Sequence, residues 1–320
     1  MQTRPLGQTG LAVSRVCLGT MTFGSQVDRS EARRIVDTCL DRGINFLDTA
    51  NAYNKGESER ILGECIRGRR DQIILASKVF NPMPEGYGGL SRAAVLRAAD
   101  DSLARLGTDY LDLYYLHQPD YSVPLEESLE AVEYLVKAGK VRFPALSNYA
   151  SWQVVEAQWI AARRGFVPVT VTQPMYNLLA RGIEQEFLPM CRERGVFTCI
   201  YNPLAGGLLT GKQQKGRPLP GSRFDNNASY LDRYWHPAAF DAVAELAEAA
   251  ERHGRSLIST ALTWIYNHTT VDCIIMGASS GEQICQNLNA IDDGPLPREL
   301  IESCDAVWAK LRGVTPKYNR

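Results

Sequence analysis

Short apolar runs alternate with segments of helical period along most of this chain. The apolar runs have the length of strands and end at polar or turn-forming residues. They are Val16–Leu18, Ile44–Leu47, Ile73–Ala76, Leu111–Leu116, Val141–Leu146, Val169–Thr172, Phe197–Tyr201 and Val271–Met276. The amphipathic segments between them predict helices. These are Ser30–Asp41, Ser58–Arg67, Arg92–Leu106, Leu125–Lys137, Trp152–Arg163, Glu184–Arg194, Pro237–His253 and Ser280–Leu288.

This alternation predicts an α/β fold in which eight parallel strands close into a (β/α)8 TIM barrel. An open doubly wound sheet is the alternative, but the G-x-G-x-x-G pattern that usually follows its first strand is absent from the sequence. Three segments lie outside the repeat: an N-terminal β-hairpin over Arg4–Val13, a long loop over Gly206–Trp235 after the seventh strand, and an extra C-terminal helix over Pro297–Leu311. We expect residues 1–320 to form a single domain of this type.

The composition narrows the class of protein. The net charge of −1 gives no sign of a nucleic-acid or membrane-surface partner, and no apolar stretch approaches the length of a membrane span. The eight cysteines show neither a CxxC pair nor the Cys/His spacing of a zinc site. We therefore expect a reduced cytoplasmic protein with no metal, no nucleic acid and no membrane partner. A homo-oligomer stays open.

Polar residues follow nearly every predicted strand, at the point where the strand ends. They are Asp48, Lys78, His117, Ser147-Asn148, Gln173, Tyr201-Asn202, Gly277 and Ser279. The carboxyl ends of barrel strands meet at one rim, where the active sites of such barrels lie. These side chains should therefore converge on a single mouth.

Tyr53 lies five residues beyond Asp48, in a loop short enough to fold back over this rim. An ammonium ion stabilises the anionic form of a nearby phenol, so we expect Lys78 to lower the pKa of Tyr53 from about 10 toward the working range. Asp48 would hold Lys78 protonated, and His117 would polarise a carbonyl oxygen. Taken singly, the four residues also fit a helix cap, a rim ion pair, a structural histidine and a packing tyrosine. Their joint placement favours carbonyl reduction.

These motifs resemble the aldo-keto reductase superfamily, in particular its bacterial members and the related potassium-channel β-subunits. The resemblance extends almost from end to end. It is carried by Leu18–Gly24, Asp48-Thr49-Ala50 with Tyr53 and Ser58-Glu59, Ser77-Lys78-Val79, Asp109–Tyr114 with His117, Gly139–Arg142, Ser147-Asn148, Gln173-Pro174 with Tyr176–Leu179, Pro203–Lys212, and Gly277-Ala278-Ser279 with Glu282-Gln283 and Asn287.

The resemblance implies an NADP(H)-dependent oxidoreductase acting on a small carbonyl or sugar substrate. It implies Tyr53 as general acid, Lys78 and Asp48 as the pair that tunes it, and His117 as the residue that orients the carbonyl. The residues expected to bind the cofactor are Gly19, Thr20, Met21, Asp48, Ser147, Asn148, Gln173, Tyr201, Asn202, Leu204, Gly207, Lys212, Arg223, Gly277, Ser279, Gln283 and Asn287. Phe23, Asn51 and Phe80 are expected to line the substrate pocket.

The sequence departs from the family pattern at four places. Asn54 stands where a glycine usually follows the tyrosine, Pro144-Ala145 precede Ser147, Asn202 replaces a serine, and Gln286 replaces a glutamate near the adenine. The Pro144-Ala145 step is expected to alter the fifth strand. None of these departures affects Asp48, Tyr53, Lys78 or His117.

Two other functions stay open at this stage. A cofactor-sensing regulatory subunit is the alternative suggested by the likeness to channel β-subunits. A metal-dependent barrel hydrolase or lyase is less favoured, because no ligand cluster is evident. The near-match to a P-loop in Gly206–Lys212 is followed by Gln213 instead of Ser or Thr, which argues against nucleotide hydrolysis.

Overall fold

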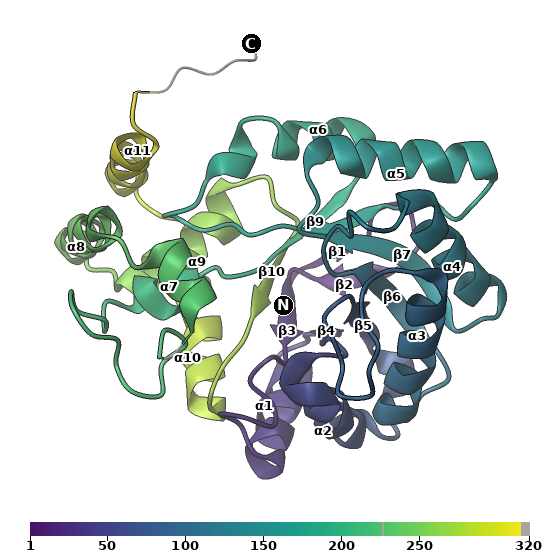
Figure 1. Cartoon of the computed structure of the whole chain (residues 1–320). Coiled ribbons are helices and arrows are strands. Elements are labelled where there is room, and N and C mark those ends of the chain that lie inside the picture. The colour runs from purple at the N-terminus through teal and green to yellow at the C-terminus, as the bar shows by residue number, and fades with distance from the viewer. Residues whose placement is uncertain (226, 315–320) are drawn as a thin grey trace.

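Eight parallel strands close into a barrel with the helices around its outside (Figure 1). The computed structural model describes residues 1–225 and 227–314. The strand order is β3 (Val16–Gly19), β4 (Phe46–Asp48), β5 (Ile74–Val79), β6 (Leu111–Leu116), β7 (Val141–Ser147), β8 (Val171–Gln173), β9 (Phe197–Ile200) and β10 (Cys273–Met276), which pairs with β3. The predicted (β/α)8 barrel is confirmed.

The predicted helices are present with ends shifted by a few residues. They are α1 (Arg29–Asp41), α2 (Glu57–Ile66), α3 (Arg92–Leu106), α4 (Leu125–Lys137), α5 (Ser151–Arg164), α6 (Phe187–Arg194), α8 (Pro237–Arg252) and α10 (Gly281–Asp292). Local signals set their ends. Asp28 caps α1 by accepting from the Glu31 amide at 2.9 Å. Gly107 ends α3 in the left-handed conformation, with φ 63°.

The helix α9 (Leu257–His268) was not predicted from the sequence. It packs against both α8 and α10, and most of its residues are buried, Thr260, Thr263 and Trp264 among them. A helix that is covered on several sides has no polar stripe, so its sequence lacks the amphipathic period that identified the others.

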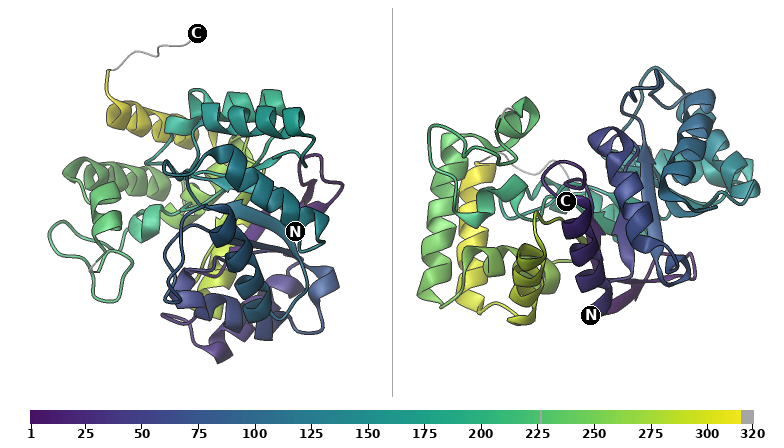
Figure 2. Two further views of the ribbon diagram at one scale, coloured as in Figure 1. Left: turned by 45° about the vertical axis from the view of Figure 1, so that its right-hand side comes forward. Right: turned by 90° about the horizontal axis from the view of Figure 1, so that it is seen from below.

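The three additions to the barrel are also present. The hairpin strands β1 (Thr3–Pro5) and β2 (Ala12–Ser14) pair antiparallel. Leu6 and Val13 from this hairpin join the apolar cluster inside the barrel. The extra helix α11 (Arg298–Arg312) lies beside α8, as Figures 1 and 2 show.

The long segment after β9 is partly helical, which corrects the expectation of a loop throughout. It contains the 3₁₀ turn η4 (Ala205–Thr210) and the helix α7 (Ala228–Tyr234). The side chain of Asn227 caps α7 by accepting from the Tyr230 amide at 3.3 Å. The burial of Tyr234 anchors this short helix to the barrel.

Strand alternation decides which side chains enter the barrel. In β5, Ala76 belongs to the cluster inside the barrel, whereas Leu75 and Val79 belong to the layer between strands and helices. Successive residues of a strand point to opposite faces, so Lys78 points inward and Ser77 outward. The same alternation places Asp48 inward, two residues after Phe46.

Pro144, which was expected to alter the fifth barrel strand, does not interrupt it. β7 runs unbroken from Val141 to Ser147 and keeps its register with β6 up to Leu146. It pairs with β8 only at Leu146 and Ser147, beyond the proline. A proline lacks the amide hydrogen that a strand donates to its neighbour, and the late start of the β8 pairing makes room for it.

Candidate active site

A buried lysine contacts two of the other side chains predicted to act with it. Lys78 is fully buried. Its Nζ donates to the carboxylate of Asp48, to the carbonyl of Thr49 at 2.8 Å and to the hydroxyl of Tyr53 at 3.5 Å. The ion pair with Asp48 lies at the ends of β4 and β5, where the strand alternation directs both side chains inward.

Asp48 is held from a second side. Its other carboxylate oxygen accepts from Nε2 of Gln173, at the end of β8, at 2.9 Å. Burial disfavours the charge on Lys78, but the Asp48 carboxylate and the Tyr53 hydroxyl outweigh it and raise the pKa of Lys78 above its usual value. The lysine is therefore a fixed positive charge next to the Tyr53 hydroxyl.

The pKa of Tyr53 changes in the direction opposite to the prediction. Burial raises it above 10, and the neighbouring Lys78 ammonium lowers it by less than burial raises it. The Asp48 carboxylate adds to the upward shift. Tyr53 therefore keeps its proton at neutral pH, so this proton is present to be donated.

His117 stands beside Tyr53 as a neutral imidazole. The two ring centroids are 5.9 Å apart in an edge-to-face arrangement. Burial and the positive charge of Lys78 lower the pKa of His117 to about 3. A neutral imidazole carries one N–H. His117 can therefore donate a hydrogen bond to a carbonyl oxygen without bringing a second positive charge.

The turn that carries Tyr53 explains the departure at Asn54. This 3₁₀ turn, η1 (Tyr53–Gly56), holds Asn54 at φ 50° and Lys55 at φ 57°. Asparagine adopts this left-handed region more readily than most residues. The Asn54 amide also donates to the carbonyl oxygens of Met21 at 2.9 Å and Phe23 at 2.6 Å. Asn54 thus supplies the conformation of a glycine and fastens the turn to the segment after β3.

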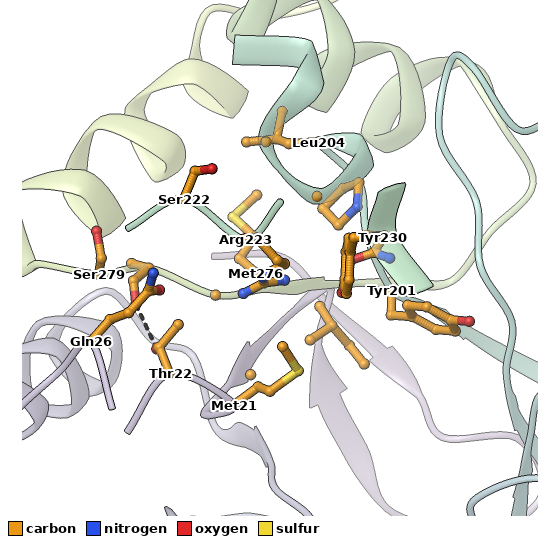
Figure 3. A pocket seen from close by; sticks show the side chains of 18 of the residues that line it. Met21, Thr22, Gln26, Tyr201, Leu204, Ser222, Arg223, Tyr230, Met276 and Ser279 are labelled. Atoms are coloured by element: carbon orange, nitrogen blue, oxygen red, sulfur yellow. Dashed lines mark hydrogen bonds between the residues drawn. The ribbon is translucent and has the colours of Figure 1, made fainter. Parts of the chain in front are cut away.

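A cavity of about 890 Å³ opens at this rim, with Asp48, Tyr53 and His117 in its lining. Every residue predicted to bind a cofactor lines it, from Gly19 on the first barrel strand to Asn287 on α10. Figure 3 shows how these side chains come from distant segments: Met21 follows β3, Tyr201 follows β9 and Met276 ends β10. Lys78 lies behind the wall and is reached through Asp48 and Tyr53.

Residues 15–309 match the Aldo/keto reductase family. The chain belongs to this family. Its relatives include a "Probable voltage-gated potassium channel subunit beta" of Arabidopsis thaliana, 37% identical over 94% of each chain. "Aflatoxin B1 aldehyde reductase member 2" of Rattus norvegicus is 37% identical over 95% of this chain and 87% of its own. "Uncharacterized oxidoreductase YrpG" of Bacillus subtilis is 36% identical over 99% of each.

Three residues predicted for the substrate pocket of this aldo-keto reductase do not line the cavity. Phe23 is fully buried in the layer between strands and helices. Asn51 is also fully buried, and half-buried Phe80 packs against the core. Position in a loop near a strand end did not reveal which way these side chains turn. The structure therefore does not place these three side chains on the wall of this cavity.

Other residues of the lining were missed. Asn81 and Gln118 come shortly after β5 and β6, so the rule that led to Lys78 and His117 also pointed to them. Tyr230 and Arg233 lie on α7, within the segment expected to be a loop. Their contribution depended on a helix that was not predicted.

The later strand ends offer groups suited to a dinucleotide. The Tyr201 hydroxyl donates to Oδ1 of Asn148 at 2.6 Å. Nδ2 of Asn202 is buried and has no partner within residues 1–225 and 227–314. A Cβ on Gly19 would lie 2.6 Å from Ile275, so only glycine leaves that wall open. Lys212 and Arg223 line the cavity, and neither forms an ion pair with another residue that the structure describes.

The described residues contain neither a cluster of metal ligands nor a membrane-spanning helix. No group of three or more His, Cys, Asp or Glu side chains in that part of the chain is arranged to hold a metal ion. No helix there has both the length and the apolar character needed to cross a membrane. All eight cysteines are free, and Cys285 alone is only partly buried.

Proposed function

We propose that this aldo-keto reductase uses NADP(H) to reduce an aldehyde or ketone, sugar-derived carbonyls included, or to run the reverse oxidation, with Tyr53 as general acid and base. The observation that carries the proposal is the buried Lys78 ammonium, which contacts both the Asp48 carboxylate and the Tyr53 hydroxyl at the wall of a large cavity. Titratable residues in a cleft whose pKa values are shifted by burial and by a specific charged neighbour are typical of a catalytic site.

Each member of the set has a separate task. When bound, the nicotinamide supplies the hydride. As the carbonyl carbon accepts it, the carbonyl oxygen gains charge and takes the proton of the Tyr53 hydroxyl. The adjacent Lys78 ammonium stabilises the phenolate that remains. His117 donates a hydrogen bond to the same oxygen and orients it.

The cavity fits a dinucleotide cofactor. Its volume of about 890 Å³ lies near the upper end of the range of ligand pockets, roughly 300–1,000 Å³. By resemblance, Ser147, Asn148 and Gln173 would hold the nicotinamide carboxamide and Tyr201 would stack on its ring. Lys212 and Arg223 line the cavity and form no ion pair with any residue that the structure describes, and they favour the extra phosphate of NADP over NAD.

The test is NADPH oxidation by the purified protein with a panel of aldehydes, ketones and sugars. Tyr53→Phe should lower kcat by roughly 10²–10⁴-fold, because it removes the hydroxyl that carries the transferable proton, and should leave NADPH binding unchanged. Tyr149→Phe is the matched control, since the buried Tyr149 hydroxyl has no partner among the described residues. Full activity of Tyr53→Phe, or no turnover across the panel, would contradict the proposal.

A cofactor-sensing regulatory subunit is the second candidate. It is favoured by the 37% identity to the relative named as a potassium channel subunit beta. The same measurements separate the two functions: tight NADPH binding with negligible turnover supports the sensor, and ready turnover supports the enzyme. The cytoplasmic location, the single-domain organisation of residues 1–320 and a homo-oligomer stay predictions.

A further inference from the structure

A buried ion pair lies directly behind the turn that carries Tyr53. Glu59, in the first turn of α2, is fully buried. Nε of Arg105 on α3 donates to its Oε2 at 2.7 Å, and the Arg105 side chain is 5% exposed. Neither residue lines the active-site cavity. The pair therefore touches neither substrate nor cofactor.

The pair contacts both pieces of backbone that carry the proposed proton donor and its lysine. Arg105 packs against Gly56, the last residue of η1, so closely that a Cβ there would lie 2.7 Å from its Cδ. Oε1 of Glu59 accepts from the Ser77 hydroxyl at 2.5 Å. Ser77 immediately precedes Lys78 on β5. The Glu59 carboxylate thus links the strand of the lysine to Arg105, which packs against the turn of the tyrosine.

The charges are not needed merely to join α2 to α3. Removing the two charges of a buried ion pair from water costs free energy, and well-packed apolar residues often hold two helices together equally well. The pair instead fixes the relative positions of the groups that it joins, because charge-assisted hydrogen bonds are geometrically specific. The turn needs such fixing, since both Asn54 and Lys55 adopt left-handed conformations that cost free energy.

The geometry of the site makes it sensitive to small shifts. The Lys78 Nζ and the Tyr53 hydroxyl are 3.5 Å apart, at the outer limit of a hydrogen bond. A displacement of η1 or β5 by a fraction of an ångström would separate them. Asn54 holds the front of the turn through Met21 and Phe23, and Arg105 supports its back at Gly56.

We propose that Glu59 and Arg105 are positioning residues that set the distance between Tyr53 and Lys78. This inference rests on the proposed role of Tyr53 as the proton donor. Its consequence is that breaking the pair lowers the rate of the chemical step while cofactor and substrate still bind.

The test compares Glu59→Gln and Ser77→Ala with the parent chain, using NADPH and 4-nitrobenzaldehyde as the probe substrate. A misplacement of about 1 Å far from the chemistry can cost on the order of 100-fold in rate, so we expect Glu59→Gln to lower kcat by roughly 10- to 100-fold. KM and the Kd for NADPH, measured by fluorescence, should not change. Ser77→Ala keeps both charges and loses only the contact to β5. It should fold normally with kcat lowered several-fold, and it decides the matter if Glu59→Gln fails to fold.

Asp112→Asn is the matched control. Asp112 is fully buried and forms ion pairs with Arg70 at 2.8 Å and Arg142 at 2.9 Å. It also accepts a hydrogen bond from the backbone amide of Leu75 on β5, the strand that carries Lys78. We expect it to lower Tm without lowering kcat at temperatures where it is folded. We also expect the alkaline limb of the kcat–pH profile to shift in Glu59→Gln but not in Asp112→Asn, which a purely structural role would not produce.

Two outcomes overturn the proposal: Ser77→Ala and Glu59→Gln with unchanged kcat, or an equal loss of kcat in Asp112→Asn. Tyr53→Phe is measured in parallel to keep the two proposals apart. If Tyr53→Phe loses activity and Glu59→Gln does not, only the positioning role fails. If Tyr53→Phe is fully active, the proposed function itself fails.

Discussion

At the scale of single residues, Lys78 stays charged in a buried position because its hydrogen-bond partners stabilise the ammonium. Its ammonium is fully buried but donates to Asp48, Thr49 and Tyr53. Removing it leaves the Asp48 carboxylate buried without a counter-charge, and breaking a buried pair in this way costs about 3–5 kcal/mol. We therefore expect Lys78→Met to lower the free energy of unfolding by about this amount, measured by urea denaturation.

The double variant Asp48→Asn/Lys78→Met is the control for this prediction. It removes both charges, so most of the lost stability should return while the enzyme stays inactive. A Lys78→Met protein as stable as the parent chain would show that the Asp48 charge is compensated by other groups, such as Gln173.

The same residues show what a sequence can and cannot reveal at this scale. The spacing of Asp48, Lys78 and His117 at successive strand ends predicted that they meet, and the structure brings them together with Tyr53. The direction of the Tyr53 pKa shift was wrong, because the sequence shows the neighbouring lysine but not the burial that outweighs it.

At the scale of elements, the period of the apolar pattern was a reliable guide only where one face of an element meets water. It found the outer helices, whose exposed faces are polar. The barrel strands were found in another way, as short continuous apolar runs, because both of their faces are buried. The period missed α9, which is buried on several sides, and α7, which is only seven residues long. Because α7 was missed, Tyr230 and Arg233 were missed as well, so the part of the cavity that α7 lines was the least predictable part of the site.

The segment between η4 and α7 carries a prediction about the cofactor. Arg223 lines the cavity here and forms no ion pair with any residue that the structure describes. A hydrogen bond to a charged group contributes about 1.5–3 kcal/mol, so Arg223→Gln should raise the Kd for NADPH by roughly 10- to 100-fold. The Kd for NADH, which lacks the 2′-phosphate, should change little.

Lys215→Gln is the control on the same segment, because Lys215 is exposed and pairs with Asp241 at 2.5 Å outside the cavity. It should leave both dissociation constants unchanged. Equal weakening of NADPH and NADH by Arg223→Gln would assign Arg223 to the pyrophosphate and remove its part in choosing NADP.

At the scale of the whole molecule, the site exists only when the barrel is closed. Its lining starts at Gly19 and ends at Asn287, and the pairing of β10 with β3 brings these two ends of the chain together. The four proposed catalytic side chains likewise come from three different strand–helix units. Global unfolding must therefore expose groups whose ionisation the fold has altered, and His117 is the clearest case.

The lowered pKa of His117 makes the stability of the protein depend on pH. In the unfolded chain this imidazole binds a proton near pH 6.5, whereas in the folded chain it stays neutral down to about pH 3. Between these values the unfolded state binds more protons than the folded state. The contribution of His117 to stability is therefore complete above pH 6.5 and is lost as the pH falls. The limit is about 1.4 kcal/mol per pH unit, or about 2 kcal/mol between pH 7 and pH 5.

We expect His117→Gln to lose less stability than the parent chain between pH 7 and pH 5, by up to about 2 kcal/mol, in urea unfolding at the two pH values. The difference between the two proteins isolates His117 from the carboxylates, which also lose their ion pairs in acid. His236→Gln removes an exposed imidazole and should follow the parent chain. If His117→Gln follows it too, the imidazole is hydrated in the folded protein. His117 would then be charged at mildly acidic pH and would bring a second positive charge beside Lys78.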